Sequence, residues 1–178
     1  MRILIAISGA SGVKLPLKFA KYLSKKHEVY LILSKGAKKV LKNEGNLKLK
    51  KYTKNLTLLK DSDLAACVSS GSFMLDAAFY YASYDFLAKA RAGLSDTLIL
   101  RSFAVNLKEN RKIIIAPRES PINEIMLKNL LKLNKLGCII APAIWADYAK
   151  GDFLDFCIGK WCDLLGINYE RFKRWEKK

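Results

Sequence analysis

The first residues whose types and spacing suggest chemistry are Ser8-Gly9-Ala10-Ser11-Gly12, directly after the apolar run Ile3–Ile7. The run is typical of a strand buried on both faces, and an amphipathic helical stretch follows the glycines. Glycines let a ligand approach the backbone, and the free N–H groups and dipole of a helix N-terminus favour an anion. A tight turn without a ligand would have the same sequence, so both interpretations stay open here. The G-x-G-x-x-G spacing of a dinucleotide site is absent.

Arg118 and Glu119 form a second candidate, because they follow a predicted strand at 113–116 and precede a helix that begins near Pro121. This position predicts a cation and an acid at the ligand-binding edge of the sheet. The arginine fork suits a phosphate, to which it donates two parallel hydrogen bonds. An ordinary surface ion pair is the competing interpretation. Four further candidates, each of which alone is typical of a surface residue, are Arg101, Lys108, Tyr148 and Lys160.

Several other kinds of chemistry lack the residues that they need. His27 is the only histidine and is expected in a surface turn, so no Ser–His or Cys–His pair can depend on it. Cys67, Cys138, Cys157 and Cys162 lack metal-ligand spacing, so no metal site is predicted. Buried free thiols in a reducing cytoplasm are the favoured interpretation of these cysteines. The sequence has no run of about 18 apolar residues, so no membrane-spanning helix is expected.

The elements that must position these residues alternate between strands and helices, which predicts an α/β fold with a parallel sheet. The chain has 178 residues, a length that suits one compact domain, 1–178. In such sheets ligands lie beyond the carboxyl ends of the strands, so Ser11, Ser34 and Glu44 are expected at one edge. The predicted strands are 3–7, 28–34, 74–83, 111–117 and 138–142, and the predicted helices are 13–25, 37–43, 84–92, 97–108, 121–136 and 152–165.

The net charge of +16 suggests anionic ligands or partners, nucleic acid among them. The basic stretch 48–54 contains a single aromatic residue, Tyr52, and lacks a nucleic-acid fold motif. A solvated basic loop is therefore favoured over a nucleic-acid patch, and any nucleic-acid binding is predicted to be nonspecific and to collapse with salt.

The sequence also resembles a known family, the flavin prenyltransferases of the UbiX type, over nearly its whole length. The Pro-Arg-Glu-Ser-Pro segment and the helix after it are the most specific part of the likeness. The segments that carry it are Ile7–Gly12, Leu107–Glu109, Ala116–Pro121, Leu127–Gly137 with the strand and Tyr148 after it, and Arg174-Trp175.

The resemblance implies a flavodoxin-like, Rossmann-type domain with helices on both faces of the sheet, assembled as a homododecamer with sites between subunits. It implies an enzyme that joins a dimethylallyl unit from dimethylallyl phosphate to N5 and C6 of reduced FMN, without metal. The prenylated FMN would then serve UbiD-type decarboxylases. Members of the family formerly passed as aryl-acid decarboxylases of ubiquinone synthesis.

The resemblance also assigns roles to particular residues. The FMN-binding set is Gly9, Ala10, Ser11, Ser34, Ser83, Tyr84, Asp85, Phe86 and Arg118. The set for dimethylallyl phosphate is Arg101, Lys108, Glu119, Tyr148, Lys160 and Trp175, with the basic residue of the last helix supplied by a neighbouring subunit. The catalytic set is Ser11, Glu44 and Glu119, in which Glu44 would be the general base that takes the flavin proton at C6.

Two positions depart from the family pattern. In the family, the middle strand is usually followed by Pro-Cys and then Ser-x-x-Thr, whereas this chain has Ala82-Ser-Tyr-Asp-Phe86. Ser83 keeps the serine, but Phe86 stands in place of the threonine. Lys160 stands where the family often has arginine, and lysine binds phosphate as a point charge without the arginine fork.

Two alternative functions remain at this stage. An FMN-dependent cysteine decarboxylase of the phosphopantothenoylcysteine type would share the fold, but that family relies on an active-site histidine, and His27 is on the wrong side of the first helix for that role. A basic nucleic-acid-binding module is the alternative from a different class of protein. A flavin spectrum would separate it from both enzymes.

Overall fold

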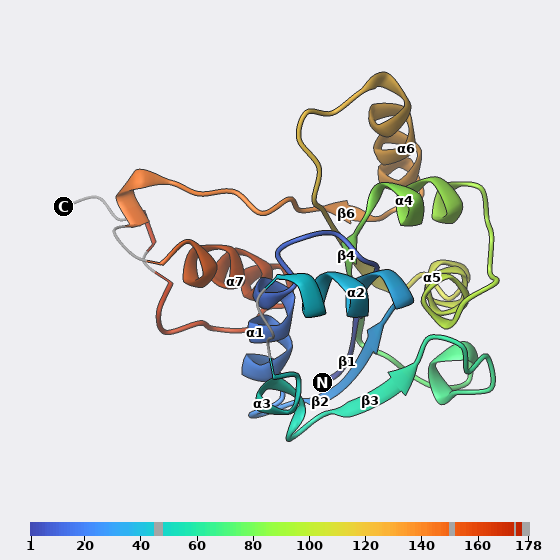
Figure 1. The fold of residues 1–178 in the computed structure, drawn as a ribbon, viewed down its shortest axis with the longest axis horizontal. Coiled ribbons are helices and arrows are strands. Elements are labelled where there is room, and N and C mark those ends of the chain that lie inside the picture. Colours follow the sequence, from blue (N-terminus) through green and yellow to red (C-terminus); the bar gives the residue numbers. More distant parts are fainter. Residues whose placement is uncertain (45–47, 150–151, 173, 176–178) are drawn as a thin grey trace.

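The computed structural model describes residues 1–44, 48–149, 152–172 and 174–175. They form a six-stranded parallel sheet with the order β3-β2-β1-β4-β5-β6 (Figure 1). The strands are β1 (Arg2–Ile7), β2 (Glu28–Leu33), β3 (Thr57–Lys60), β4 (Ala77–Ala82), β5 (Lys112–Pro117) and β6 (Ile139–Ile140). The α/β class and the parallel sheet predicted from the sequence are therefore confirmed.

The strand order is that of a doubly wound, Rossmann-type sheet. From β1 the chain builds β2 and β3 on one side, and then returns to place β4, β5 and β6 on the other side. The loops that leave β1 and β4 consequently diverge, and the crevice between them is where ligands bind in such sheets.

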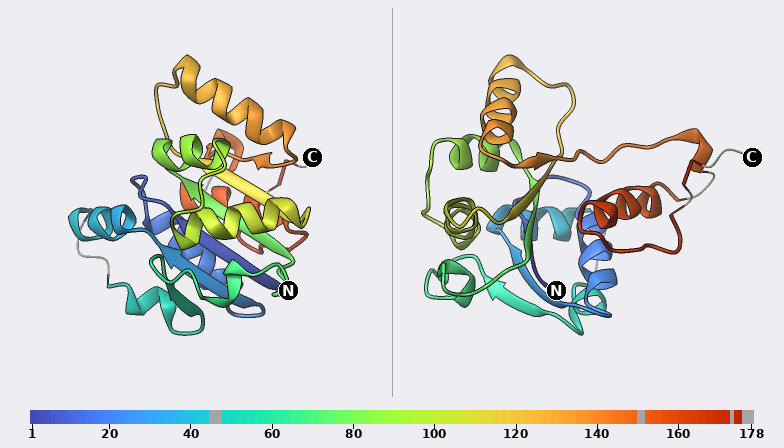
Figure 2. Two further views of the ribbon diagram at one scale, coloured as in Figure 1. Left: turned by 90° about the vertical axis from the view of Figure 1, so that its right-hand side faces the viewer. Right: turned by 180° about the vertical axis from the view of Figure 1, so that it is seen from behind.

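Helices cover both faces of the sheet (Figure 2). Alternate residues of β1 point to opposite sides: Ile5 joins the apolar cluster that contains α1 and α7 residues, and Leu4 joins the cluster that contains residues of α4, α5 and α6. The helices are α1 (Lys14–Leu23), α2 (Lys35–Asn43), α3 (Lys50–Thr53), α4 (Tyr84–Arg91), α5 (Leu98–Lys108), α6 (Glu124–Lys135) and α7 (Phe153–Leu164), with short 3-10 turns η1 (Cys67–Ser69) and η2 (Asp147–Ala149).

Several predicted elements differ from the structure: the strand predicted at 74–83 begins only at Ala77, the helix predicted at 37–43 begins at Lys35, and β3 and α3 were not among the predicted elements. Three further differences have local reasons. The helix predicted at 121–136 begins only at Glu124, because the Asn123 side chain accepts a hydrogen bond from the Met126 N–H at 3.0 Å. The strand predicted at 138–142 shrinks to Ile139–Ile140, because Pro142 has no N–H with which to continue the ladder. The N-cap of α5 is Thr97 instead of Asp96.

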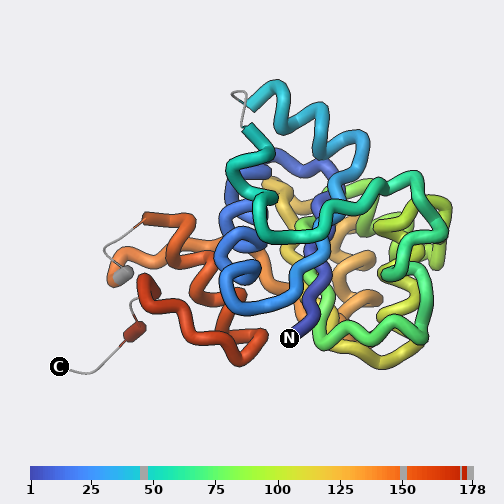
Figure 3. The backbone as a smooth tube through the Cα atoms, turned by 90° about the horizontal axis from the view of Figure 1, so that it is seen from below, coloured from blue at the N-terminus to red at the C-terminus, as the bar shows by residue number. Residues whose placement is uncertain are grey.

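The apolar face of the helix predicted at 121–136 is only partly buried. Met126 and Leu133 are buried, whereas Ile125, Leu127 and Leu131 are each more than half exposed. Beyond β6 the chain runs out from the sheet as segment 141–149, which Figure 1 and Figure 3 show projecting away from the body. Its residues Ile144 and Trp145 are also exposed, so a single chain presents apolar surface in two places.

The cysteines are free, and three of them are buried, whereas Cys67 is only partly buried. In the described part of the chain, His, Cys, Asp and Glu side chains form no group that could hold a metal ion. None of the described helices is both long enough and apolar enough to cross a membrane.

Candidate active site

The loop after β1 makes a sharp turn at the carboxyl edge of the sheet. Gly9 and Gly12 have φ values of +103° and +80°, a conformation that side chains disfavour. A Cβ atom on Gly9 would also lie 3.1 Å from the backbone of Gly36 and of Ala37. The loop therefore depends on glycine both for its turn and for its close packing against the first turn of α2.

Two serines tie the ends of β1 and β4 together at the switch point. The Ser8 hydroxyl accepts a hydrogen bond from the Ser83 N–H at 2.9 Å and lies 3.1 Å from the Tyr81 carbonyl, to which it donates. In return, the Ser83 hydroxyl donates to the Ser8 carbonyl at 3.1 Å. Ser83 also caps α4. This reciprocal pair fixes the spacing of the two loops that flank the crevice.

Helix α2 brings a carboxylate to the same edge. Ser34 caps the helix by accepting a hydrogen bond from the Ala37 N–H at 2.9 Å. At the other end of α2, Glu44 accepts hydrogen bonds from the Gly12 N–H at 2.8 and 3.0 Å and from the Val13 N–H at 3.3 Å. The carboxylate thus lies at the N-terminus of α1, where the backbone and the helix dipole favour negative charge. The structure in this way places Ser34 and Glu44 beside the Ser8–Gly12 loop.

A cavity of about 600 Å³ opens beside this loop. Arg118 and Glu119, directly after β5, line it together with Tyr81, Gly12 and Phe153. The Arg118 N–H donates to the Ala82 carbonyl at 3.1 Å, so the turn after β5 is held against the end of β4. The cavity therefore combines a cation, an acid and an aromatic ring next to the N-terminus of α1.

Tyr81 is a cavity residue that the sequence analysis missed. Its hydroxyl donates to the Ser11 carbonyl at 2.9 Å, and its side chain is only 2% exposed. Burial raises the pKa of Tyr81 to about 12, although the Arg118 guanidinium opposes the shift, so the hydroxyl remains a donor at neutral pH. The alternation of side chains along β4 could have indicated this position. Phe79 and Tyr81 face the α1 side of the sheet, whereas Tyr80 faces the other side.

The chain is similar in sequence and in structure to known proteins. A family model described as Flavoprotein matches residues 1–161. A flavin prenyltransferase UbiX from Helicobacter pylori is 42% identical, with 98% of each chain covered. The chain belongs to the UbiX family of flavin prenyltransferases.

Solved structures agree with this membership. A dodecameric FMN-dependent UbiX-like decarboxylase from Escherichia coli O157:H7 has a TM-score of 0.94 and 29% identity, and covers 99% of this chain and 100% of its own. AnUbiX, solved in complex with FMN and dimethylallyl pyrophosphate, has a TM-score of 0.93 and 33% identity, with 99% and 98% covered. The resemblance stated from the sequence motifs is therefore confirmed.

The turn after β4 of this UbiX-family member contains Phe86, which the resemblance predicted to stand in place of a threonine. Phe86 is 2% exposed and stacks on Tyr80, with ring centroids 5.3 Å apart. Tyr84 is partly buried, and Asp85 is exposed and pairs with Lys89 at 3.0 Å. The Phe86 side chain consequently stabilises the core beneath α4 and provides no hydroxyl at the crevice.

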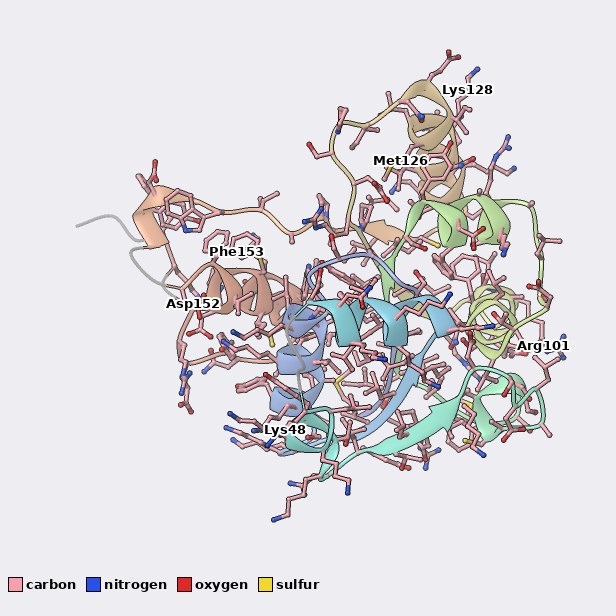
Figure 4. All side chains as sticks on the ribbon, in the orientation of Figure 1. Lys48, Arg101, Met126, Lys128, Asp152 and Phe153 are labelled. Carbon is pink, nitrogen blue, oxygen red and sulfur yellow. The ribbon has the colours of Figure 1, made fainter. Side chains whose placement is uncertain are left out.

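Two predicted site residues of the UbiX-type chain lie on α5, away from the cavity. Arg101 donates to the Ser69 carbonyl at 3.3 Å, and Figure 4 shows it on the opposite side of the molecule from Phe153. Lys108 ends α5 just before β5 begins, and it pairs with Glu109. Because β5 begins there, Lys108 lies at the amino edge of the sheet, opposite the cavity.

Three more predicted residues lie at or near the C-terminal part of the chain. Tyr148, near the end of segment 141–149, contacts Trp175, with ring centroids 5.1 Å apart. Lys160 is exposed on α7, about two turns, or roughly 10 Å, along the helix from Phe153. One chain therefore brings the Ser8–Gly12 loop, Ser34, Ser83, Glu44 and the Arg118–Glu119 turn to one edge of the sheet, but leaves the Phe86 side chain in the core and five predicted substrate-binding residues outside the cavity.

Proposed function

We propose that the chain joins a dimethylallyl unit from dimethylallyl phosphate to N5 and C6 of reduced FMN, with prenylated FMN as the product. The observation that carries this proposal is the cavity at the carboxyl edge of the sheet, which Gly12, Arg118 and Glu119 line and beside which Glu44 accepts a hydrogen bond from the Gly12 N–H. The presence of FMN and dimethylallyl pyrophosphate in AnUbiX supports both ligand classes.

FMN, the acceptor substrate of this reaction, suits the residues at the carboxyl edge. A volume of about 600 Å³ lies within the range of small-molecule sites. Arg118 is placed to bind an anionic group with its fork, and the glycine turn leaves backbone close to the ligand space. The proposed FMN contacts are Gly9, Ala10, Ser11, Ser34, Ser83, Tyr84, Asp85, Phe86 and Arg118.

Transfer of the prenyl group requires two kinds of stabilisation. The phosphate that leaves must be stabilised by fixed positive charge, and the allylic carbon needs an apolar or π surface, which the flavin and Trp175 would provide. Glu119 lines the cavity of its own chain. The other proposed contacts, Arg101, Lys108, Tyr148, Lys160 and Trp175, could reach a cavity only from another subunit.

Assembly of several copies is therefore part of the proposed function. The exposed apolar residues of α6 and of segment 141–149 offer contact surfaces for it. The dodecameric neighbour supports an oligomer of the same kind, a homododecamer.

Glu44 is the proposed general base. Its carboxylate is held next to the Ser11 loop by backbone N–H groups, within the reach of a ligand bound on that loop. Ser11 and Glu119 are proposed to assist at the same site. Proton removal at C6 would come last, after the bond to N5 has formed.

Two proposals concern the setting of the enzyme. Its product would be taken up by a UbiD-type decarboxylase, and its compartment would be the cytoplasm, which suits four free cysteines. The cysteine decarboxylase alternative is disfavoured, because His27 precedes β2 at the amino edge of the sheet, where its Nδ1 lies 3.4 Å from the chain's amino group.

The direct test is to incubate the protein with reduced FMN and dimethylallyl phosphate, without added metal, and to weigh the flavin by mass spectrometry. We expect a flavin heavier by one five-carbon unit. A flavin of unchanged mass, in a protein that binds FMN and matches the wild-type fold by circular dichroism, would contradict the proposed function. The same assay with dimethylallyl pyrophosphate shows whether that donor is also accepted.

A smaller effect is expected at Tyr81. Tyr81→Phe removes the hydrogen bond to the Ser11 carbonyl, which is worth roughly 0.5–1.5 kcal/mol, so FMN should bind about 2- to 13-fold more weakly. Tyr80→Phe is the matched control, because its hydroxyl contacts buried Ser102 on the other face of the sheet. Fluorescence titration would measure both affinities. Equal FMN affinities in the two variants would show that Tyr81 does not position the loop.

A further inference from the structure

A second concavity, of about 720 Å³, lies along the outer face of α1, outside the cavity described above. Its floor is the polar face of that helix, one wall comes from α3, and the other comes from α7 and the residues after it. Figure 1 shows α1 between α7 and α3. We name this concavity the α1 groove; it is lined by Lys14, Lys18, Lys21, Tyr22, Lys25, Lys51, Tyr52, Asp155, Ile158, Tyr169, Glu170 and Arg171.

The α1 groove is strongly basic. It contains five lysines and one arginine but only two acids. Of these acids, Asp155 accepts a hydrogen bond from the Tyr169 hydroxyl at 2.5 Å and lies 3.9 Å from Arg171. The uncompensated charge of the groove is therefore positive, and an approaching anion would be attracted.

Most of the groove lysines have no acidic partner in the described part of the chain. Lys18 pairs with Asp152 at 3.4 Å, whereas the other four groove lysines have no ion pair with a described acid. Lys21 lies over the Tyr52 ring at 5.9 Å, and Lys25 lies over the Tyr22 ring at 5.7 Å. Tyrosine rings thus hold two of the ammonium groups without neutralising them. Side chains that end in nitrogen can be followed beside α1 in Figure 4.

The α1 groove adjoins the candidate active site. Lys14 lines both the groove and the cavity of about 600 Å³, because it begins α1 at the carboxyl edge of the sheet. From Lys14 the lysines continue at positions 18 and 21 along one face of the helix and at position 25 in the turn after it, over roughly 16 Å. One end of this row of lysines therefore lies at the cavity.

We propose that the α1 groove is an approach path that draws phosphate monoesters toward the cavity. The identity of these anions, FMN and dimethylallyl phosphate, rests on the proposed function. A concave surface lined by charge of one sign can raise association rates by about 10- to 1000-fold, and the effect falls with ionic strength. Lys21 and Lys25 do not line the cavity. They should therefore speed association without holding the bound ligand.

The test compares two double variants with equal loss of charge. Lys21→Gln/Lys25→Gln removes two groove charges, whereas Lys132→Gln/Lys135→Gln removes two from the last turn of α6. Stopped-flow fluorescence with FMN alone gives the association and dissociation rates. At low salt we expect the groove variant to associate roughly three- to tenfold more slowly than wild type, and the α6 variant less than about twofold more slowly. Dissociation rates should be unchanged, and the difference should vanish near ~0.5 M salt.

Three results would overturn the approach path. Equal association rates in the two double variants would show that net charge alone matters. A faster dissociation in the groove variant would show that Lys21 and Lys25 contact the bound ligand. Tight binding of a short single-stranded oligonucleotide at physiological salt, lost only in the groove variant, would assign the groove to nucleic acid. FMN binding is measured without dimethylallyl phosphate, so a protein that binds FMN but does not prenylate it would contradict the proposed function alone.

Discussion

Glu44→Gln is expected to slow the closure of the new ring on the flavin by about 10²–10⁴-fold, the usual cost of losing a general base. Glutamine keeps the size of the side chain and one oxygen that can accept the Gly12 N–H, but it cannot take a proton. The loop should therefore keep its shape, and FMN affinity should stay within a few-fold of wild type. The prenyl phosphate should still be cleaved, because base action comes after the first bond to the flavin.

The measurement is a quenched time course in which the flavin is followed by mass and absorbance. The variant should accumulate flavin that has gained the five-carbon unit at N5 but not the bond at C6. Glu124→Gln provides the control, since Glu124 is an exposed carboxylate on α6 that pairs with Lys128. A Glu44→Gln protein that closes the ring at the wild-type rate would leave Glu44 with only its capping of α1.

Lys160→Ala should impair the use of dimethylallyl phosphate while leaving FMN binding nearly unchanged. Loss of one charge-assisted hydrogen bond costs roughly 1.5–3 kcal/mol, which is about ten- to over a hundredfold in kcat/KM for the prenyl donor. Lys160→Arg should retain activity, because an arginine fork also binds phosphate. Steady-state kinetics at saturating FMN would separate these variants, and an unchanged kcat/KM in Lys160→Ala would remove Lys160 from the site.

A mixing experiment tests whether Lys160 acts across subunits. Lys160 lies roughly 10 Å along α7 from the cavity residue Phe153 of its own chain, so the proposed contact with the prenyl phosphate would come from the Lys160 of a neighbouring subunit. Oligomers co-expressed from Lys160→Ala and Glu44→Gln chains should then contain some complete sites. With random mixing, about a quarter of the sites would combine an intact Glu44 with a neighbour's intact Lys160. Activity no higher than that of either variant alone would contradict sharing between subunits.

The sequence by itself determined most of the sheet, without the edge strand β3, and most of its ligand edge. Apolar runs such as Ile3–Ile7 are long enough, and free enough of charge, that only a strand buried on both faces accommodates them. Once the strands are parallel, their carboxyl ends must lie at one edge. The residues that follow them, Ser11, Ser34, Ser83 and Arg118, were therefore predictable as neighbours without any knowledge of side-chain packing.

The tertiary structure alone decided the contacts that depend on direction and on partners. Tyr81 contacts Ser11, and Tyr80 does not, because the strand pleat sends neighbouring side chains to opposite faces. Glu44 reaches Gly12 only because α2 spans the distance between Ser34 and the β1 loop. Motif resemblance could assign Lys108 and Lys160 to a site but could not locate them. The distance between two elements depends on how the chain folds, and, under the proposed function, for these two residues on how copies of the chain would assemble.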